Sequence, residues 1–457
     1  MDKSRERMMN TSTSTVIDQT AMESVIQDFL PELIAIRHHI HQHPEIGFEE
    51  VATAQLVAEK LTAWGLTVTT GIGGTGVVAT LRGRYLGEDS IGLRADMDAL
   101  YINEKTDLPY ASVHAGKMHA CGHDGHTTML LGAARYLSQH PDFAGTVHFI
   151  FQPAEEGLGG GLAMLNDGLL TTFPCNRLFG LHNKPGIEVG QFAIRSGPML
   201  AASDTWQVTF HGTGGHGGSG VHLSIDPTLP AAQFMLGLQT IVSRNVPAMD
   251  AAVLSVGHIQ GGDIHAPNVI PDRVILKGTG RSYSPSVRHL LETRLRALAH
   301  STAQGFGATA DVHYERQYPA LVNDTHATQL AINAAAQVVG LEQVDTAMTP
   351  LLGAEDFAYM LEQRPGAFMM LGNSDKNAAN VHHLHTPHYD FNDALIPLGI
   401  RYWATLVYQE LGLSRTELSR TGLSGTGSSG NDSASPHGLN ITAHDVGASD
   451  GEREQKG

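Results

Sequence analysis

The chain has 457 residues, of which 41% are hydrophobic and 16% charged, a composition typical of a globular protein. Its formal net charge is −17, from 29 basic and 46 acidic residues. This balance argues against nucleic acid as the main partner, because binding phosphates needs a surplus of Lys and Arg. The length is enough for about two or three domains of ordinary size.

The cysteine content and the N-terminal sequence favour a reducing compartment of the cell. Two cysteines, Cys121 and Cys175, cannot make a disulfide framework, so a reducing compartment fits best. Residues 1–20 are polar and have no apolar stretch of signal-peptide length. No run approaches the ~20 apolar residues that a membrane span requires. We therefore expect a cytoplasmic protein that does not bind membranes.

The first section of the chain alternates helices and strands. Residues 1–20 are expected to be a disordered tail, and an α/β section runs over 21–195. It opens with apolar side chains at helical spacing: Val25, Ile26, Phe29, Leu30, Leu33, Ile36 and Ile40. A helix is predicted over 126–139, among strands at 76–83, 90–95, 145–152 and 177–182. This alternation predicts a mixed, largely parallel sheet flanked by helices.

The second section, 196–310, has a different pattern. A strand at 204–212 is followed by a helix that opens at Asp226-Pro227, because proline favours an early helical position. The later elements are strands at 251–260, 273–281 and 308–316 and a helix at 285–305. The order β-α-β-β-α-β is that of a ferredoxin-like domain. Residues 311–413 return to the first style, so the small α+β domain is expected to be inserted into the larger one. A Ser- and Gly-rich tail, 414–457, is expected to be disordered.

The densest group of chemically active side chains is MHACGHDGH, residues 118–126. Cys121 and His123 are two positions apart, and Gly122 allows a sharp turn between them. A thiolate and an imidazole at this spacing can ligate one or two metal ions. The alternative is a buried thiol beside surface histidines.

A second group, FQPAEEG at 151–157, follows the predicted strand 145–152. Open α/β sheets build their sites at such strand ends. Of the adjacent carboxylates Glu155 and Glu156, one can bind a metal while its neighbour acts as a general base. An exposed acidic turn is an equally good interpretation of this segment in isolation.

Two further histidine segments are weaker signals. His182, in FGLHN at 179–183, ends an apolar strand, and a lone histidine there is more often structural. The segment HHLHTPHYDFND, 382–393, offers four histidines and two aspartates, too many to choose among by spacing. What favours a site is that the fragments fall at successive strand ends of one predicted sheet.

These segments, in this order, resemble the dinuclear metallopeptidase and amidohydrolase family that includes aminoacylase and glutamate carboxypeptidases. Within it they are most similar to the branch of hippurate hydrolase and indole-acetyl amino acid conjugate hydrolases. Segments 37–50, 93–104, 266–274, 278–282 and 353–360 also match, so the resemblance covers about residues 30 to 410. HACGHDGH together with QPAEEG is highly specific.

The resemblance implies roles for individual residues around two divalent metal ions. Glu155 would be the base that takes a proton from water, and Asp96 a carboxylate that orients a ligand from behind. Arg94 stands where the wider family has a ligating histidine, and the resemblance implies that His123 replaces it. The implied metal ligands are Cys121, His123, Glu156, His182 and His385. Zinc suits thiolate and imidazole, whereas manganese or cobalt also accept carboxylates.

The second section resembles the family's lid, which also forms a homodimer or homotetramer. His216 matches a histidine that reaches into the partner subunit's site and stabilises the oxyanion. Asn268 and Arg281 resemble groups that hold the substrate's carboxylate, a task that suits the planar guanidinium. After His216 the chain reads GGSGVHL, with one residue more than this branch usually has.

The resemblance therefore implies a metal-dependent amidohydrolase that cleaves N-acyl or N-aroyl amino acids, such as hippurate, into a carboxylic acid and a free amino acid. A carboxypeptidase or dipeptidase on the same scaffold is one alternative. A thiol hydrolase with Cys121 as nucleophile is a second, although it leaves QPAEEG unexplained. A binding protein without activity is a third, disfavoured because all proposed ligands and the base are present.

Overall fold

The computed structural model describes residues 17–376 and 381–412. Its first helix, α1 (Gln19–Gln42), begins two residues inside the segment predicted as a tail, because Asp18 caps it by accepting hydrogen bonds from the amides of Thr20 and Ala21, both 3.0 Å long. Of the apolar residues predicted at helical spacing, Val25 and Leu30 are partly buried and the others lie on its buried face. The predicted tail 414–457 lies outside the described residues.

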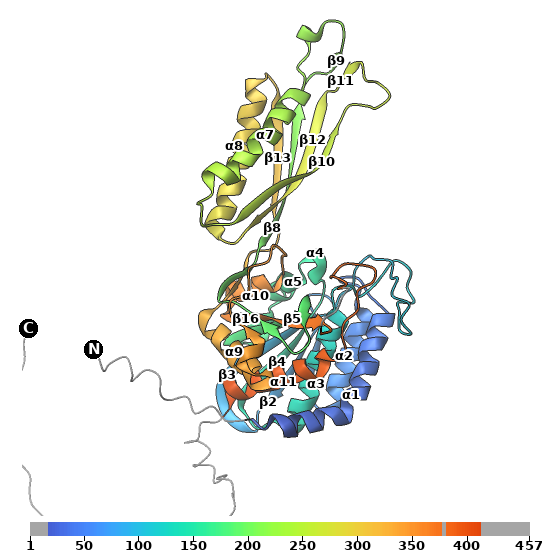
Figure 1. The fold of residues 1–457 in the computed structure, drawn as a ribbon, viewed down its shortest axis with the longest axis vertical. Coiled ribbons are helices and arrows are strands. Elements are labelled where there is room, and N and C mark those ends of the chain that lie inside the picture. Colours follow the sequence, from blue (N-terminus) through green and yellow to red (C-terminus); the bar gives the residue numbers. More distant parts are fainter. Residues whose placement is uncertain (1–16, 377–380, 413–457) are drawn as a thin grey trace, which may run out of the picture. The chain divides into compact units, whose positions relative to one another are not determined.

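The larger part of the chain is built on an eight-stranded mixed sheet (Figure 1). The pairs β4–β3, β3–β5, β5–β16 and β6–β15 are parallel, whereas β1–β2, β2–β4 and β16–β6 are antiparallel. The predicted mixed, largely parallel sheet is thereby confirmed. Its strands in spatial order are β1 (Thr67–Ile72), β2 (Gly76–Arg82), β4 (Ala144–Gln152), β3 (Tyr85–Asp96), β5 (Arg177–Glu188), β16 (Gly366–Ser374), β6 (Phe192–Ala193) and β15 (Val344–Asp345).

Helices flank this sheet and close one continuous apolar core. Four of them pack on one another: α1, α3 (His123–Gln139), α9 (Thr325–Val339) and α11 (Leu395–Leu411). A second group consists of three short helices: α5 (Gly160–Asn166), α6 (Leu169–Thr172) and α10 (Phe357–Gln363). Helix α5 packs on β4 and also contacts α6 and α10, and α10 packs on β5. The remaining elements are α2 (Val51–Ala63), which packs on β1 and β2, the short α4 (Glu155–Leu158), and the pair β7 (Gly197–Leu200) and β14 (Leu321–Asn323).

Residues 202–316, called here the inserted segment, form a second sheet with its own core. The four strands are antiparallel, in the spatial order β10 (Ala252–Gly261), β12 (Arg273–Ser282), β8 (Ala202–His211) and β13 (Thr309–Arg316). Helices α7 (Thr228–Asn245) and α8 (Pro285–Gly305) pack on the sheet and on each other, and a small pair, β9 (Gly215–His216) and β11 (Val269–Ile270), extends from it. The predicted order β-α-β-β-α-β is the observed one.

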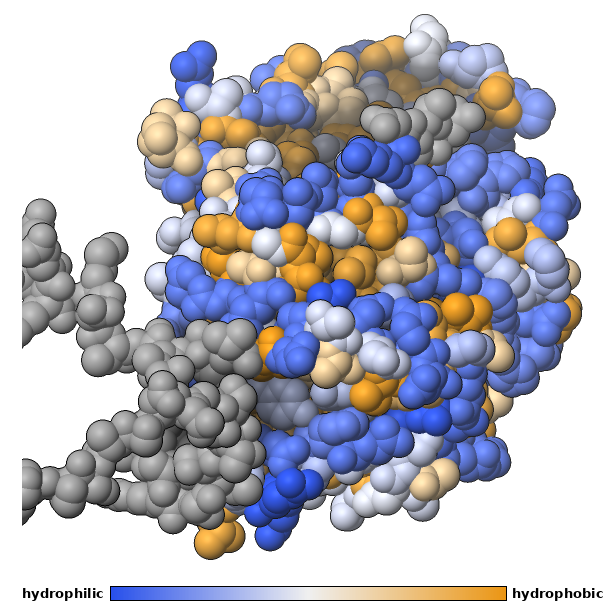
Figure 2. Space-filling view, turned by 60° about the horizontal axis from the view of Figure 1, so that its bottom comes forward, coloured by the Kyte–Doolittle hydropathy of each residue, from blue (hydrophilic) through white to orange (hydrophobic). Residues whose placement is uncertain are grey.

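The surface shows the mixture usual for globular proteins. Hydrophilic residues predominate on the face shown in Figure 2, with hydrophobic ones in small groups between them. None of the helices in the described ranges combines the length and hydrophobicity that crossing a membrane requires.

Candidate metal-dependent active site

The register of the parallel strands brings three chain segments to one edge of the large sheet. Asp96 at the end of β3 pairs with Gln152 at the end of β4, and Arg94 pairs with Gly180 of β5. His182 follows two residues later on β5, opposite Met370 of β16. The segments FQPAEEG and FGLHN, predicted to meet at strand ends, therefore lie at the end of β4 and within β5, the two strands that flank β3.

Gly122 explains how Cys121 and His123 reach the same edge. Its φ is 95°, in the left-handed region that favours glycine, and α3 begins at the next residue. A Cβ atom at this position would lie 2.3 Å from Oδ1 of Asn183 and 2.6 Å from the hydroxyl of Tyr389. Only glycine fits this close approach, and the sharp turn places the thiol and the imidazole together above the strand ends.

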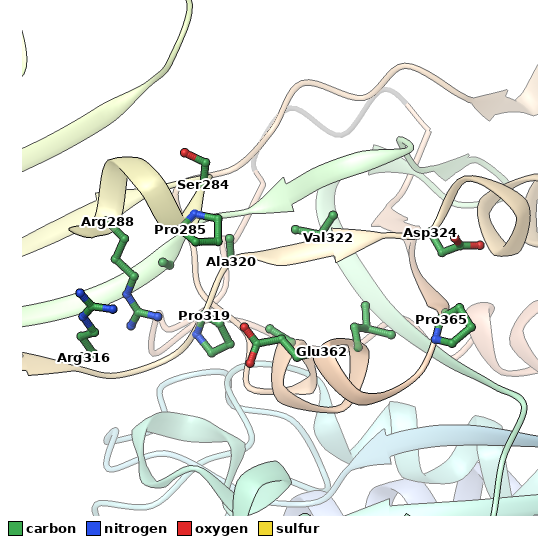
Figure 3. Close-up of a pocket in the computed structure, with 14 residues that line it drawn as sticks. Ser284, Pro285, Arg288, Arg316, Pro319, Ala320, Val322, Asp324, Glu362 and Pro365 are labelled. Atoms are coloured by element: carbon green, nitrogen blue, oxygen red, sulfur yellow. The ribbon is translucent and has the colours of Figure 1, made fainter. Parts of the chain in front are cut away.

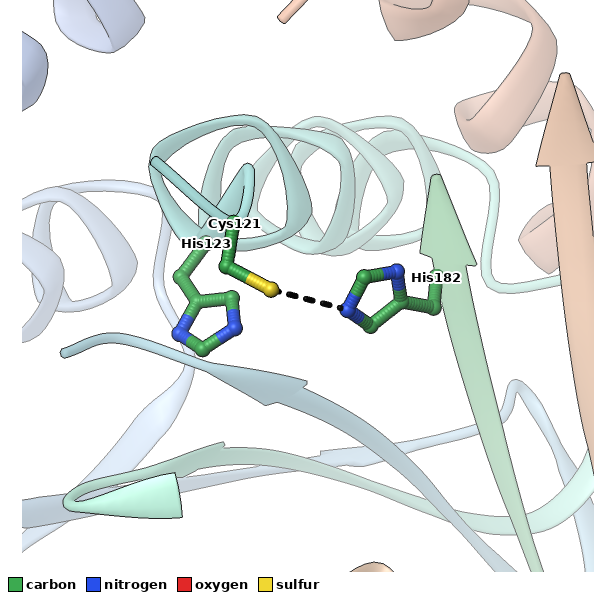
Figure 4. A group of neighbouring side chains, drawn as sticks. All are labelled: Cys121, His123 and His182. Atoms are coloured by element: carbon green, nitrogen blue, oxygen red, sulfur yellow. Dashed lines mark hydrogen bonds between the residues drawn. The ribbon is translucent and has the colours of Figure 1, made fainter. Parts of the chain in front are cut away.

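The structure brings together all five residues implied as metal ligands, together with the implied base. The potential ligand atoms of Cys121, His123 and His182 lie within 4.8 Å of one another, and the Sγ of Cys121 is 3.5 Å from Nε2 of His182 (Figure 4). The same limit holds for Cys121, Glu156 and His385, and for His123, Glu155 and Glu156. Two trios that share one thiol have the arrangement expected for two metal ions bridged by a thiolate.

Side chains behind the cluster orient His123. Its Nδ1 lies 3.1 Å from Oδ1 of Asp98, while its buried Nε2 has no hydrogen-bond partner among the described residues. Oδ2 of Asp98 accepts a hydrogen bond of 2.9 Å from the amide of Glu156. A ring with one nitrogen held by a carboxylate and the other free has the usual form of a metal ligand, so the donor set fits a cation.

The resemblance implies that Asp96 orients a metal ligand, but in the structure Asp98 contacts Nδ1 of His123 and Asp96 contacts His126. Oδ1 of Asp96 is 2.6 Å from Nδ1 of His126, and Oδ2 is 3.7 Å from Nε2 of His123. The other ring nitrogen of His126 contacts Asn183, so His126 is fully engaged and not free to bind metal. Asp98 was missed in the sequence, although its spacing of two from Asp96 was a usable signal.

The pKa shifts of the side chains in the cluster are consistent with a cation-binding site. Burial, followed by the charges of Glu156 and Glu155, raises the pKa of the Cys121 thiol well above its ordinary value. Burial and the neighbouring His126 hold the pKa of His182 well below its ordinary value, which keeps the imidazole neutral. For His123, burial lowers the pKa, but the Asp96 and Asp98 carboxylates outweigh burial and raise it to about 10. A bound cation would favour thiolate and neutral imidazole instead.

Glu155 lies in a setting suited to proton transfer. The side chain is buried, and burial together with the charges of Glu355 and Glu156 raises its pKa well above the ordinary value. A carboxylate with raised basicity beside a metal cluster can take a proton from water at neutral pH. Ala154, directly before it, has a φ of 53°, one of four positive values at non-glycine residues in the described ranges; His385, at 61°, is another. Such conformations concentrate at functional sites.

Arg94 fills the position for which the resemblance implies a ligating histidine in the wider family. Its guanidinium is buried and donates to Asp96, Glu355 and Asp356 at 2.8, 2.8 and 3.1 Å, and to Gln152 at 2.8 Å. Every nitrogen is therefore engaged with an acceptor, so Arg94 neutralises the carboxylates behind the cluster and binds no metal. The sequence pattern did not reveal this role, because its acceptors are up to 262 positions away.

We expect Arg94→Met to destabilise the fold strongly. It would leave Asp96, Glu355 and Asp356 buried without their counter-charge, and removing one partner of a buried ion pair costs about 3–5 kcal/mol. Urea unfolding would show this as a lower midpoint with an unchanged slope. The exposed Arg82, substituted in the same way, is the control and should stay within about 0.5 kcal/mol of the wild type. Equal midpoints for both variants would contradict the role of Arg94.

A cavity of about 440 Å³ opens onto the cluster. One side of the cavity is lined by the residues of the cluster: Cys121, Glu155, Glu156, His182 and His385. Its other wall is apolar and consists of Leu200, Leu351, Leu352, Phe368, Met370 and Leu384. Lys184 is the one lysine or arginine among the lining residues. A cavity with polar groups converging on one side of an apolar wall is the usual form of a small-molecule site.

The residues implied to bind substrate from the inserted segment do not line this cavity. His216 and Asn268 are exposed and lie together, because His216 pairs with Val269 across β9–β11 and the amide of Gly217 donates to the carbonyl of Asn268 at 2.7 Å. Arg281 is half-buried on β12, where its guanidinium donates to the carbonyl of Gly280 at 2.9 Å and to the hydroxyl of Thr279.

A second, larger cavity of about 530 Å³ lies where the inserted segment joins the larger part (Figure 3). Its two arginines are already neutralised. Arg288 donates to Asp204 from Nε and Nη2 at 2.9 and 2.5 Å, and Arg316 donates to Glu292 at 2.8 Å. With its cations satisfied and no ligand cluster at its walls, it lacks the chemistry of the smaller cavity.

Fold and site together define the class. An α/β sheet that carries thiol, imidazole and carboxylate ligands beside a buried basic carboxylate is the framework of a metal-dependent hydrolase. The chain belongs to peptidase family M20/M25/M40, whose pattern it matches over residues 92–409. The predicted resemblance is thereby confirmed, and the enzyme is a metal-dependent amidohydrolase.

Individual relatives match over most of their length. The chain is 40% identical to a hippurate hydrolase of Campylobacter jejuni over 84% of this chain and 98% of the relative. It is also 40% identical to an N-acetyl-L-cysteine deacetylase of Bacillus subtilis, over 80% of this chain and 85% of the relative. The crystal structure of the Bacillus subtilis YXEP protein, a dinuclear metal-binding peptidase of the M20 family, superposes with a TM-score of 0.72 at 34% identity and covers 84% of this chain and 99% of that one.

Proposed function

We propose that this protein hydrolyses the amide bond of N-acyl or N-aroyl amino acids, with two divalent metal ions in the cluster around Cys121. The observation that carries the proposal is the pair of ligand trios sharing one thiol beside Glu155, at the mouth of a half-apolar cavity. Relatives named for hippurate and for N-acetyl-L-cysteine support this substrate class. Zinc, manganese and cobalt all suit the donor set.

In the proposed mechanism, Cys121, His123, Glu156, His182 and His385 hold the metal ions. Metal ions bound there would supply a nucleophile from water at neutral pH and polarise the amide carbonyl. Glu155 takes the proton of the attacking water on its carboxylate and passes it to the leaving nitrogen. The apolar wall of the cavity receives the acyl or aryl group and excludes water from it.

His216 is proposed to donate a hydrogen bond to the oxyanion in a partner subunit's site. Its Nδ1 accepts hydrogen bonds of 3.0 Å from the amides of both Gly218 and Ser219. The proton of the neutral ring therefore lies on Nε2, which makes the exposed ring a donor. The loop with the additional residue supplies both of these amides, so this loop itself orients His216.

A homodimer or homotetramer formed by the inserted segment is part of this proposal. β10 is an edge strand of its sheet, and exposed apolar side chains lie on β10 and on the adjacent α7: Leu229, Leu236 and Ile259. Exposed edges and apolar patches favour association. Sedimentation at several protein concentrations would measure the mass, and a monomer at all of them would exclude the role of His216 across subunits.

A cytoplasmic location is also proposed. Both cysteines are free and buried, which suits a reducing compartment. Expression with a fluorescent fusion and fractionation of the cell would locate the protein, and its recovery from an oxidising compartment would contradict the proposal.

The function is tested with a panel of N-acetyl, N-benzoyl and indole-acetyl amino acids, beside dipeptides, on the metal-reconstituted protein. Hydrolysis of N-acyl amino acids with higher kcat/KM than dipeptides is the expected result. Higher kcat/KM for dipeptides would favour the carboxypeptidase alternative, and no hydrolysis of either would contradict the proposed substrate class.

A thiol hydrolase is disfavoured by the surroundings of Cys121. Its buried thiol has a raised pKa, and the adjacent His182, with a lowered pKa, is a poor base. Chelation separates the two chemistries, because a thiol enzyme keeps its activity in EDTA. We expect activity to be lost in EDTA and restored by adding metal.

For the substrate carboxylate we expect Arg281→Ala to raise KM by about 10- to 100-fold, the range for hydrogen bonds to a charged group. Substrates with an amide in place of the carboxylate should be unaffected. The control is Arg273→Ala, an exposed arginine on the same strand. Equal effects on both kinds of substrate would exclude this role for Arg281. An effect confined to Lys184→Met would assign carboxylate binding to the cavity's own lysine.

A further inference from the structure

The turn that carries Glu155 is irregular. Ala154, Gly157 and Gly159 have positive φ values of 53°, 83° and 75°, and Glu156 has a ψ of 71°, outside the helical range. The two glycines adopt such values without strain, whereas the conformation of Ala154 persists only where surrounding groups hold it. The position of the proposed base therefore depends on what binds the backbone of residues 154–161.

Buried carboxylates hold three amides of this turn. Glu50 accepts from Ala154 at 2.8 Å, Asp98 from Glu156 at 2.9 Å, and Asp356 from Gly161 at 2.7 Å. All three carboxylates belong to the larger part of the chain. None of these bonds involves the backbone carbonyl of Glu155 itself.

Tyr318 makes the hydrogen bond to that carbonyl. Its buried hydroxyl donates to the backbone oxygen of Glu155 at 2.6 Å and accepts from the amide of Gly159 at 3.1 Å. One hydroxyl thus joins the two ends of α4 and fixes the residue from which the proposed base projects.

Tyr318 also lies at the connection to the inserted segment, two residues after β13 ends at Arg316. Its backbone carbonyl accepts from the amide of Ser203 on β8 at 3.0 Å, and the carbonyl of Ser203 accepts from Gln317 at 3.1 Å. The two chain crossings into the inserted segment therefore pair with each other at Tyr318. Arg288 of α8 adds a bond of 3.0 Å to the carbonyl of Gln317.

We propose that Tyr318 is a positioning residue, which holds Glu155 in place for proton transfer and ties the turn of the base to the connection of the inserted segment. The inference rests on the proposed role of Glu155 as the base. A misplacement of about 1 Å in an active site can cost about 100-fold in rate. A hydroxyl that holds both ends of the turn is therefore expected to act on kcat. Tyr318 is not one of the residues that line the substrate cavity, so KM should stay unchanged.

The test is Tyr318→Phe, with Tyr359→Phe as the matched control. The two rings contact each other, with centroids 6.0 Å apart, and the hydroxyl of Tyr359 donates to Gln317 at 3.0 Å without touching the turn. We expect Tyr318→Phe to lower kcat by about 10- to 100-fold, with KM and metal content unchanged. Tyr359→Phe should remain near the wild type. Equal kcat values for both variants, or a change in KM alone, would overturn the proposal.

Hydrogen exchange gives a readout that is independent of activity. In Tyr318→Phe the amide of Gly159 loses its acceptor, so peptides that cover residues 154–160 should exchange faster than in the wild type or in Tyr359→Phe. Unchanged exchange there, or a uniform rise over the whole chain, would overturn the proposal. If the wild type hydrolyses none of the amides tested, the proposed function fails, while the exchange data still decide whether Tyr318 holds the turn.

Discussion

Glu155→Gln should lower kcat by about 10²- to 10⁴-fold, the range for loss of a general acid–base group, while both metal ions stay bound. The amide cannot take a proton from water, yet it has nearly the shape of the carboxyl group that it replaces. Glu155 is buried beside Glu355 and Glu156, whose charges add to burial in raising its pKa, so its carboxylate is a more basic proton acceptor than an ordinary glutamate and faces the cavity. Steady-state kinetics with metal analysis of the same sample would measure both quantities.

The control for this variant is Glu292→Gln. Glu292 lies on α8, where it pairs with Arg296 and Arg316 and contacts neither the cluster nor the cavity. It should leave kcat unchanged. A Glu155→Gln protein with full metal content and near wild-type kcat would remove Glu155 from the role of base.

Cys121→Ser should weaken metal binding by more than the roughly 10- to 100-fold that follows loss of a group behind the ligands. The thiol belongs to both ligand trios, so its loss affects both metal positions at once. A serine hydroxyl is a poor replacement for a thiolate in the binding of zinc-like cations. Titration of the metal-free protein, followed by calorimetry, would give the affinities.

Cys175→Ser is the matched control, because it removes the only other thiol of the chain. Cys175 is also buried, but its Sγ contacts the backbone carbonyl of Phe173 at 3.4 Å and lies outside the described ligand groups. It should keep full metal affinity. Full occupancy in Cys121→Ser would exclude this thiol as a ligand, and loss of activity with full occupancy would revive the thiol mechanism.

The order of the main elements could be predicted from the sequence, and several bounds to within a few residues, because the periodic patterns are clear, although β3 and β5 are longer than predicted. Helix α8 begins and ends where the pattern indicates, and β2 differs by one residue. Helix α3 begins at His123 rather than at 126, since Gly122 permits a turn that hydrophobic spacing does not reveal. Pro227 was predicted at an early position of a helix, but it directly precedes α7, which begins at Thr228.

The site was predictable where its residues stand in dense motifs and was missed where they are dispersed. Cys121 and His123 stand in one short segment and Glu155 in another, and the turn at Gly122 brings the first to the end of β4, which the second follows. The supports of these residues come from distant positions: Arg94 is held by Glu355 and Asp356, and the turn of Glu155 by Tyr318. Contacts over such separations depend on tertiary packing, which no local pattern encodes.

The carboxylates behind and within the cluster also affect the folding stability of the enzyme, and with it the proteolytic lifetime in the cell. Six of them lie near one end of the sheet, and only the last three contact the guanidinium of Arg94: Asp98, Glu155, Glu156, Asp96, Glu355 and Asp356. Cations that bind only the folded chain would offset this repulsion and shift the folding equilibrium, by about 2.7 kcal/mol at 100 times Kd. The proteolytic lifetime of the protein would then follow the supply of metal, so that scarcity removes the enzyme as well as its activity.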